Sequence, residues 1–245
     1  MPVYKAEAII LRRRILGEAD RVITFFTREH GKVAAVARGV RKTTSRMSGR
    51  LEPFAHVRLL VARGRTLDVV AQVEVVEGMA PLRGDLERFG QAALVAELLD
   101  AATPEREPHP ELFRLLAETL GLMARGDSQA TAVWFVLHLI SLVGFNPALD
   151  RCAVCGGGLG ASPSWSHPLG GMTCSRCAAR DPAAMRLRPE MAAVLRALLA
   201  ARAEDLSGVT ISARDHDRLL DLLRRYAEHR LEVRLRSPGV ISQFR

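Results

Sequence analysis

The chain has 245 residues, of which 48% are hydrophobic and 25% charged, a composition near the globular average in which no stretch is biased enough to be called disordered. Its length exceeds the usual size of one domain, so we expect two domains, or one domain with an insert. The net charge of +8 suits a nucleic acid, an anionic membrane or an acidic protein as partner.

The positive excess is confined to the first third of the chain. Residues 1–80 contain 15 Lys and Arg against 8 Asp and Glu, whereas residues 81–245 contain 20 against 19. Of the 35 basic residues 32 are Arg, as codon usage in a GC-rich genome would produce. Codon usage explains the choice of Arg over Lys but not the asymmetry, so the distribution favours a functional basic surface.

The N-terminal residues lack the charged start, apolar run and cleavage site of a signal peptide, so we expect a cytoplasmic protein. The longest apolar stretch, residues 130–145, is interrupted by His138 and Ser141. It is shorter than the roughly 20 residues that span a bilayer. This stretch therefore predicts a buried core helix and no membrane partner.

Residues 6–77 alternate short β-rich runs with turn signals. Five strands are expected, at residues 6–11, 22–27, 32–37, 56–62 and 67–76. A small closed barrel is the economical architecture, because closure removes exposed sheet edges. The segment between the third and fourth strands, residues 38–50, is basic and polar with nothing to bury, and it predicts a surface loop.

After Pro81 the apolar residues recur at helical spacing. The pattern predicts helices at residues 85–102, 111–123, 130–142, 189–203 and 214–231. The chain is therefore expected to be an α+β multidomain protein, with a β-barrel first and helices after it.

All four cysteines lie in one segment, as two C-x-x-C pairs separated by eighteen residues: Cys152 with Cys155, and Cys174 with Cys177. Two such turns can supply the four thiolates of tetrahedral zinc. Structural disulfides are disfavoured in a cytosolic protein, and a redox C-x-x-C would not need a second copy. We therefore expect one structural Zn²⁺ that keeps residues 151–180 folded.

His167 lies between the two cysteine pairs and could replace one thiolate. Because four cysteines already fill the coordination shell, we expect it to be a surface histidine. A closed shell has no position for water, so catalysis at zinc is not expected.

Motifs of an active site are missing from the sequence. It contains no phosphate-binding G-x-x-x-x-G-K-[ST], no G-x-S-x-G and no H-E-x-x-H. The carboxylates Glu18, Asp20 and Glu29 are scattered, whereas a two-metal nuclease would need them clustered. We therefore expect a protein that is not an enzyme.

Three groups of residues resemble a known family. The first is Gly-Glu-Ala-Asp at 17–20, with Phe-Thr-Arg-Glu-His-Gly-Lys at 26–32 and Ala-Arg-Gly-Val-Arg at 37–41. The second is Gly-Phe-Asn-Pro-Ala-Leu-Asp-Arg-Cys-Ala-Val-Cys-Gly from residue 144, with Gly-Gly-Met-Thr-Cys-Ser-Arg-Cys from residue 170. The third is Arg-Leu-Arg-Ser from residue 234. Together they resemble the bacterial recombination-mediator family RecO, from the first strand to the last helix.

The resemblance implies an N-terminal OB-fold, then an α-helical domain with a zinc-binding insert. The implied domains are residues 1–80 (OB-fold), 81–150 and 181–245 (the two parts of the helical domain) and 151–180 (the insert). Family members act in DNA repair and recombination in the RecFOR pathway. They bind single- and double-stranded DNA, anneal complementary strands and work with RecR to help load RecA onto coated DNA. The coat is single-strand-binding protein, whose acidic C-terminal tail binds the helical domain. A nucleoid-associated cytoplasmic protein is implied.

We assign DNA binding to basic side chains of the barrel. The groove is expected to be lined by Arg38, Arg41, Lys42, Arg46 and Arg50, with Lys32, Arg63 and Arg65 nearby. Phosphate contacts do not read bases, so binding should tolerate any sequence and weaken with salt.

Base stacking is expected to contribute little, because the first eighty residues contain few aromatic side chains: Tyr4, Phe25, Phe26 and Phe54. Phe25 and Phe26 are adjacent on a strand, so at most one of them can face outward. Two other functions stay open. The barrel could receive an acidic protein, as an adaptor whose partners contact the DNA, or the chain could be a metal-dependent nuclease.

Overall fold

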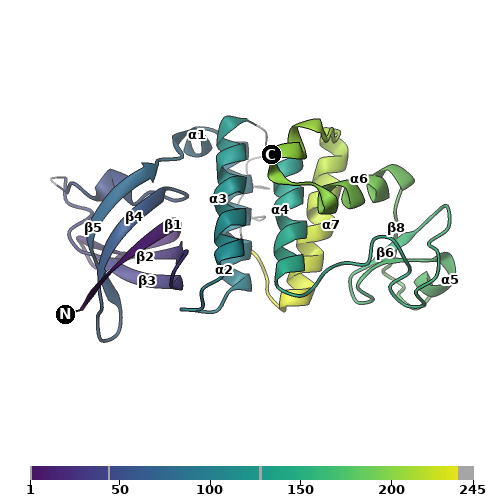
Figure 1. Ribbon diagram of the computed structural model, residues 1–245, viewed down its shortest axis with the longest axis horizontal. Helices are drawn as coiled ribbons and strands as arrows, with labels where there is room; N and C mark the ends of the chain where they lie inside the picture. Colours follow the sequence, from purple (N-terminus) through teal and green to yellow (C-terminus); the bar gives the residue numbers. More distant parts are fainter. Residues whose placement is uncertain (1, 44, 127–128, 237–245) are drawn as a thin grey trace. The chain divides into compact units, whose positions relative to one another are not determined.

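The computed structural model describes residues 2–43, 45–126 and 129–236. These residues fold into two compact units, the first made of residues 2–125 with Arg236 and the second of the described residues up to 235. The boundary falls inside the 81–150 segment that the sequence assigns to the helical domain. The four-part domain division stays a prediction. Figure 1 shows both units and labels helices and strands of each.

The first unit begins with a closed barrel in the order β1-β2-β3-β5-β4 (Figure 1), which confirms the predicted five strands. The strands are β1 (Val3–Leu16), β2 (Asp20–Thr27), β3 (Gly31–Ala37), β4 (His56–Ala62) and β5 (Asp68–Glu77). β3 and β5 pair in parallel, and the other neighbours are antiparallel. This is an OB-type barrel.

β1 is longer at both ends than the sequence predicts. Its first half, from Val3 to Ile9, pairs with β4, and its second half, from Ala8 to Leu16, pairs with β2. A bulge between Ile10 and Arg12 accompanies the change. The segment 12–16 carries no inward apolar alternation, so only its pairing with β2 identifies it as strand.

Barrel side chains point alternately inward and outward. On β3 the inward Val33, Ala35 and Ala37 are buried and the residues between them are partly exposed. β2 is different, because Phe25 belongs to the interior cluster while its outward neighbour Phe26 is also fully buried. The outer face of β1 and β2 is therefore covered, and part of this cover is a helix packed against β1.

Helices α1 (Ala80–Arg83), α2 (Leu86–Ala102) and α3 (Pro110–Arg125) complete the first unit. Asp85 caps α2 by accepting the backbone N–H of Arg88 at 2.8 Å. Edge-to-face ring pairs join the barrel to the helices: Phe54 with Phe89, 5.4 Å apart, and His56 with Phe113, 5.8 Å apart.

The second unit contains α4 (Gln129–Leu142), α6 (Pro189–Ala200), the 3-10 helix η2 (Ala203–Gly208) and α7 (Ala213–Leu231). α4 packs against α6 and α7, and most of its described side chains are buried, as the apolar stretch predicts. Trp134 on α4 donates to the carbonyl of Ala201 at 2.9 Å. Among the described residues, none of the helices is long and apolar enough to cross a bilayer.

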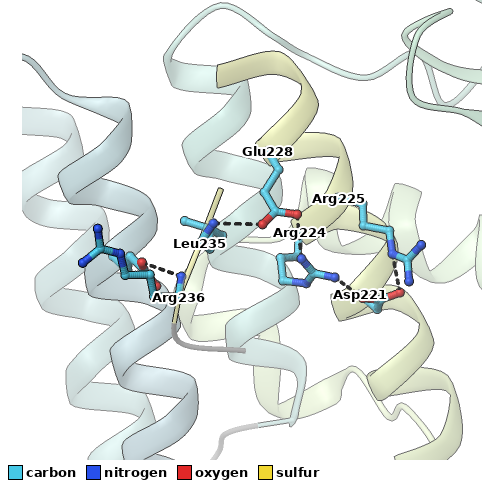
Figure 2. Close-up of polar contacts among 7 residues, drawn as sticks. Asp221, Arg224, Arg225, Glu228, Leu235 and Arg236 are labelled. Atoms are coloured by element: carbon cyan, nitrogen blue, oxygen red, sulfur yellow. Dashed lines mark hydrogen bonds and ion pairs between the residues drawn. The ribbon is translucent and has the colours of Figure 1, made fainter. Parts of the chain in front are cut away.

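A network of ion pairs and hydrogen bonds on α7 fixes the segment that follows the helix (Figure 2). Arg224 donates to Asp221 at 2.5 Å and to Glu228 at 2.6 Å. The other carboxylate oxygen of Glu228 accepts the backbone N–H of Leu235 at 2.9 Å. This anchors the C-terminal motif of the sequence up to Arg236, whereas residues 237–245, which the predicted helical domain includes, lie outside the described part.

Candidate nucleic-acid interface and metal centre

The loop between β3 and β4, residues 38–50, lies on the barrel surface, with Thr44 outside the described part. Its five predicted DNA-binding side chains are all exposed: Arg38, Arg41, Lys42, Arg46 and Arg50. The expectation that the loop buries nothing is wrong. Val40 is 2% exposed and Met47 packs on the barrel interior, so two apolar side chains anchor the loop.

Hydrogen bonds fix this loop to the turn between β1 and β2. The backbone N–H of Arg41 donates to the carbonyl of Ala19 at 2.9 Å, and that of Gly39 donates to the Asp20 carboxylate at 2.7 Å. The Arg41 guanidinium donates to the carbonyls of Gly17 and Glu18 at 3.1 and 2.8 Å. The hydrogen bonds therefore join residues 14–21 to the described residues of 38–50, and we call the exposed surface of these two segments the basic edge.

Two cations of the basic edge were missed by the sequence analysis. Arg14 is exposed near the end of β1, opposite Val22, and Arg21 lies on β2 opposite Ala37. Neither forms an ion pair with any residue that the structure describes. Their place follows from the β1–β2 register, which could have been found had β1 been extended past residue 11.

Lys32 does not belong to the basic edge. It lies near the start of β3, six residues or roughly 20 Å of strand from Arg38. Its ammonium lies 3.0 Å from the Asp100 carboxylate on α2 and donates to the Asp100 carbonyl at 2.5 Å. Arg12 donates to the same carboxylate at 2.6 Å. Lys32 therefore joins the barrel to a helix.

The Asp100 carboxyl is half-buried, and burial alone would raise its pKa. The hydrogen bonds and charges of Arg12 and Lys32 outweigh burial and hold the pKa below its usual value. The carboxylate is therefore ionised, and it compensates part of the positive charge of Arg12 and Lys32.

Arg63 and Arg65 also lie apart from the basic edge. Both are exposed in the turn between β4 and β5. The Arg63 guanidinium lies over the Tyr4 ring, 5.6 Å from its centroid, and that ring contacts His30 just before β3. Because Arg38 follows the other end of β3, the structure separates these two arginines from the loop.

No aromatic side chain of the barrel is presented for stacking in the part that the structure describes. Phe25, Phe26 and Phe54 are buried. Tyr4 is half-buried, and its hydroxyl donates to the buried Asp68 carboxylate at 2.7 Å. Burial and this hydrogen bond raise the Tyr4 pKa above its usual value. The described surface of the barrel therefore presents cationic side chains to a nucleic acid, but no aromatic ring for base stacking.

The four cysteines form one cluster in the second unit. The sulfur atoms of Cys152, Cys155, Cys174 and Cys177 all lie within 4.8 Å of one another, and those of Cys155 and Cys174 are 4.0 Å apart. Tetrahedral zinc with bonds of about 2.3 Å places its sulfurs about 3.8 Å apart. The cluster therefore fits a tetrahedral metal ion with four sulfur ligands.

The thiols differ in acidity. Burial raises the pKa of Cys152, but backbone N–H groups of Cys155, Cys174 and Val154 outweigh it and lower the pKa to about 6. Burial and the neighbouring thiols raise the pKa of Cys177 to about 12. The N–H groups that stabilise a Cys152 thiolate would equally support a metal-bound sulfur.

Short strands position the cysteines. β6 (Ser164–Ser166) pairs with β7 (Gly171–Thr173) and with β8 (Met185–Arg186), and α5 (Ser175–Ala178) follows β7. Cys174 is the N-cap residue just before α5, and Cys177 lies within the helix. Ala153 donates its N–H to the carbonyl of Met172 at 2.8 Å, which ties the first cysteine turn to β7.

His167 is not a metal ligand in this arrangement, and it is not the surface residue that we expected. It is half-buried, and its Nδ1 lies 3.0 Å from the indole nitrogen of Trp165. Its ring also contacts Tyr226 on α7. Burial lowers its pKa. The residue therefore packs the cysteine segment against a helix.

Comparison with known proteins finds a matching family model for the N-terminal part of the chain and another for the rest. The family model described as recombination protein O N terminal matches residues 1–79, and the one described as recombination protein O C terminal matches residues 83–239. A DNA repair protein RecO of Pelotomaculum thermopropionicum is 41% identical over 244 residues, which cover 100% of this chain and 95% of that protein. The DNA repair protein RecO of Bifidobacterium adolescentis is 37% identical over 97% of this chain and 98% of its own.

Proposed function

The chain belongs to the RecO family of DNA repair proteins, and we propose that it is a mediator that binds single- and double-stranded DNA and anneals complementary strands. With RecR it would help load RecA onto DNA coated with single-strand-binding protein. The proposed setting is the cytoplasm, in association with nucleoid DNA.

The observation that carries this proposal is the basic edge. Arg14, Arg21, Arg38, Lys42 and Arg46 form no ion pair with any described residue, whereas Lys32 and Arg12 share an ion pair with Asp100. A cluster of uncompensated cations attracts a polyanion, and binding is driven by release of counterions from the phosphates. Arginine and lysine hold phosphates without reading bases, as a mediator that acts on any sequence requires.

Annealing follows from the same chemistry. A strand held by its phosphates keeps its bases available for pairing, and neutralised strands repel one another less. Burial of the barrel aromatics supports this picture, because few rings compete for the bases.

The proposed role of the metal centre is structural, with Zn²⁺ held by Cys152, Cys155, Cys174 and Cys177. Four protein sulfurs complete a tetrahedral shell, so no position is left for water or substrate. We therefore propose no catalytic step. Cleavage of labelled DNA in the presence of magnesium would contradict this part of the proposal.

Strand annealing on DNA coated with single-strand-binding protein, measured with and without RecR, tests the function. The wild type should anneal the coated strands, and Arg38→Ala/Lys42→Ala should lose most of that activity. The matched control is Lys5→Ala/Arg58→Ala, which removes two exposed cations from strands β1 and β4 of the same barrel, outside the basic edge. Equal loss in both variants would show that only total charge matters. If neither variant loses activity, the basic edge is not the DNA site.

A further inference from the structure

Two aliphatic side chains lie exposed at the tip of the β1–β2 hairpin. Ile15 is 66% exposed and Leu16 is 41% exposed. They are the last residues of β1 and pair with Arg21 and Asp20 on β2. Neighbouring residues of a strand point to opposite faces, so the tip is apolar on both sides.

The tip is held in place. Gly17 begins the turn with φ of 59°, a conformation that suits glycine. The Arg41 side chain binds two carbonyls of the turn, and its backbone N–H binds the carbonyl of Ala19. The loop therefore braces the hairpin, and ordering it on binding would cost little entropy.

The charged residues around the hairpin tip indicate which class of partner could bind it. The cations beside it are those of the basic edge: Arg14, Arg21, Arg38, Arg41 and Lys42. The Asp20 carboxylate is occupied by the N–H of Gly39, which leaves Glu18 as the exposed carboxylate of the turn. A second copy of this chain would bring like charges together. Single-stranded nucleic acid combines phosphates with exposed apolar base faces, and it complements both features.

We propose that Ile15 and Leu16 insert between adjacent bases of a single DNA strand whose phosphates lie on the cations of the basic edge. This rests on the proposed function, because it requires DNA on that surface. Aliphatic side chains that enter a base step unstack it. An unstacked strand presents separated bases to its complement, which would assist annealing.

The test uses the full-length protein and a single-stranded oligonucleotide with 2-aminopurine between adenines, whose fluorescence rises when the base is unstacked. The wild type should raise the fluorescence, because an inserted aliphatic side chain unstacks the neighbouring base. Ile15→Ser/Leu16→Ser should abolish most of the rise, while affinity measured by anisotropy falls less than about threefold because phosphate contacts dominate.

Two further variants separate insertion from general effects. Val75→Ser/Val76→Ser removes two consecutive exposed aliphatic residues from β5 and should leave the rise intact. Ile15→Val/Leu16→Met keeps the tip apolar and should retain the rise.

The insertion is overturned if the serine pair keeps the full rise, if the β5 control loses it equally, or if the wild type binds without any rise. Failure of the wild type to bind the oligonucleotide would instead overturn the proposed function. Loss of a wild-type dimer in the serine pair would assign the tip to self-association and also overturn the insertion.

Discussion

At the residue scale, cations of equal charge differ in their neighbours. Lys32 faces Asp100, and its side chain is 13% exposed, whereas Lys42 is exposed and has no ion-pair partner in the described part of the chain. A sequence shows the charge of both residues but not the carboxylate 68 positions away that binds one of them. The predicted site residues therefore divide into free and occupied ones.

Lys32→Ala should lower the free energy of unfolding by about 1–3 kcal/mol, because it leaves the Asp100 carboxylate with one cation fewer. It should leave DNA affinity nearly unchanged. Lys42→Ala should leave stability unchanged and reduce the salt dependence of DNA binding by about one phosphate contact. Urea unfolding and fluorescence anisotropy check the pair. The reverse pattern would mean that Lys32 is the DNA ligand.

Asp100 also predicts a pH dependence. Its pKa in the folded chain is below the ordinary value of about 3.9. The unfolded chain therefore binds a proton first as pH falls, so the stability that this group contributes is present above about pH 4 and is lost below it. Asp100→Asn should be less stable than the wild type at neutral pH, and the difference should shrink toward pH 3. Urea unfolding at several pH values measures it, and a constant difference would contradict the assignment.

At the element scale, the strands and helices were predictable within a few residues because their periodicity is local. The sheet of β6, β7 and β8 was not, since strands of two or three residues carry no periodic signal. The extension of β1 over residues 12–16 was missed for a related reason. These residues pair with β2 but show no alternation of apolar and polar side chains that would predict a strand. The cysteine cluster was predictable, because two C-x-x-C pairs at this spacing are typical of the ligands of a metal ion.

A substitution at Gly171 on β7 tests how closely the sheet of β6, β7 and β8 packs against the backbone of Ala148. Its φ is 130°, and a Cβ there would lie 2.6 Å from the backbone nitrogen and oxygen of Ala148. Gly171→Ala should destabilise the chain by about 1–3 kcal/mol. Gly158→Ala, with nothing within 4 Å, should be nearly neutral. Thermal unfolding compares the two, and equal melting temperatures would contradict the packing.

Removal of the metal should destabilise the cysteine segment, residues 151–180. Elemental analysis should find one zinc per chain, and a chelator should make residues 151–180 sensitive to protease, because the metal would link the two cysteine pairs of this segment. DNA affinity should change by less than about twofold, since the basic edge belongs to the other unit. A protease pattern that is unaffected by the chelator would show that the metal does not support the fold.

At the scale of the whole molecule, the positive excess and the cysteine cluster lie in different compact units. The barrel with α2 and α3 forms one compact unit and carries the positive excess, whereas the other unit carries the cysteine cluster. The family and the barrel could be identified from sequence motifs. The sequence could not show which cations lack an ion-pair partner, because ion pairs depend on contacts between elements far apart in the chain.

Affinity for a single strand across a salt titration tests the central claim most directly. The wild type is compared with Arg38→Ala/Arg41→Ala/Lys42→Ala, and unfolding measurements confirm that the variant is folded. If these cations hold phosphates, the variant should bind more weakly, and the slope of log affinity against log salt should fall by about two. An unchanged affinity and slope in the folded variant would contradict the claim that the basic edge binds DNA.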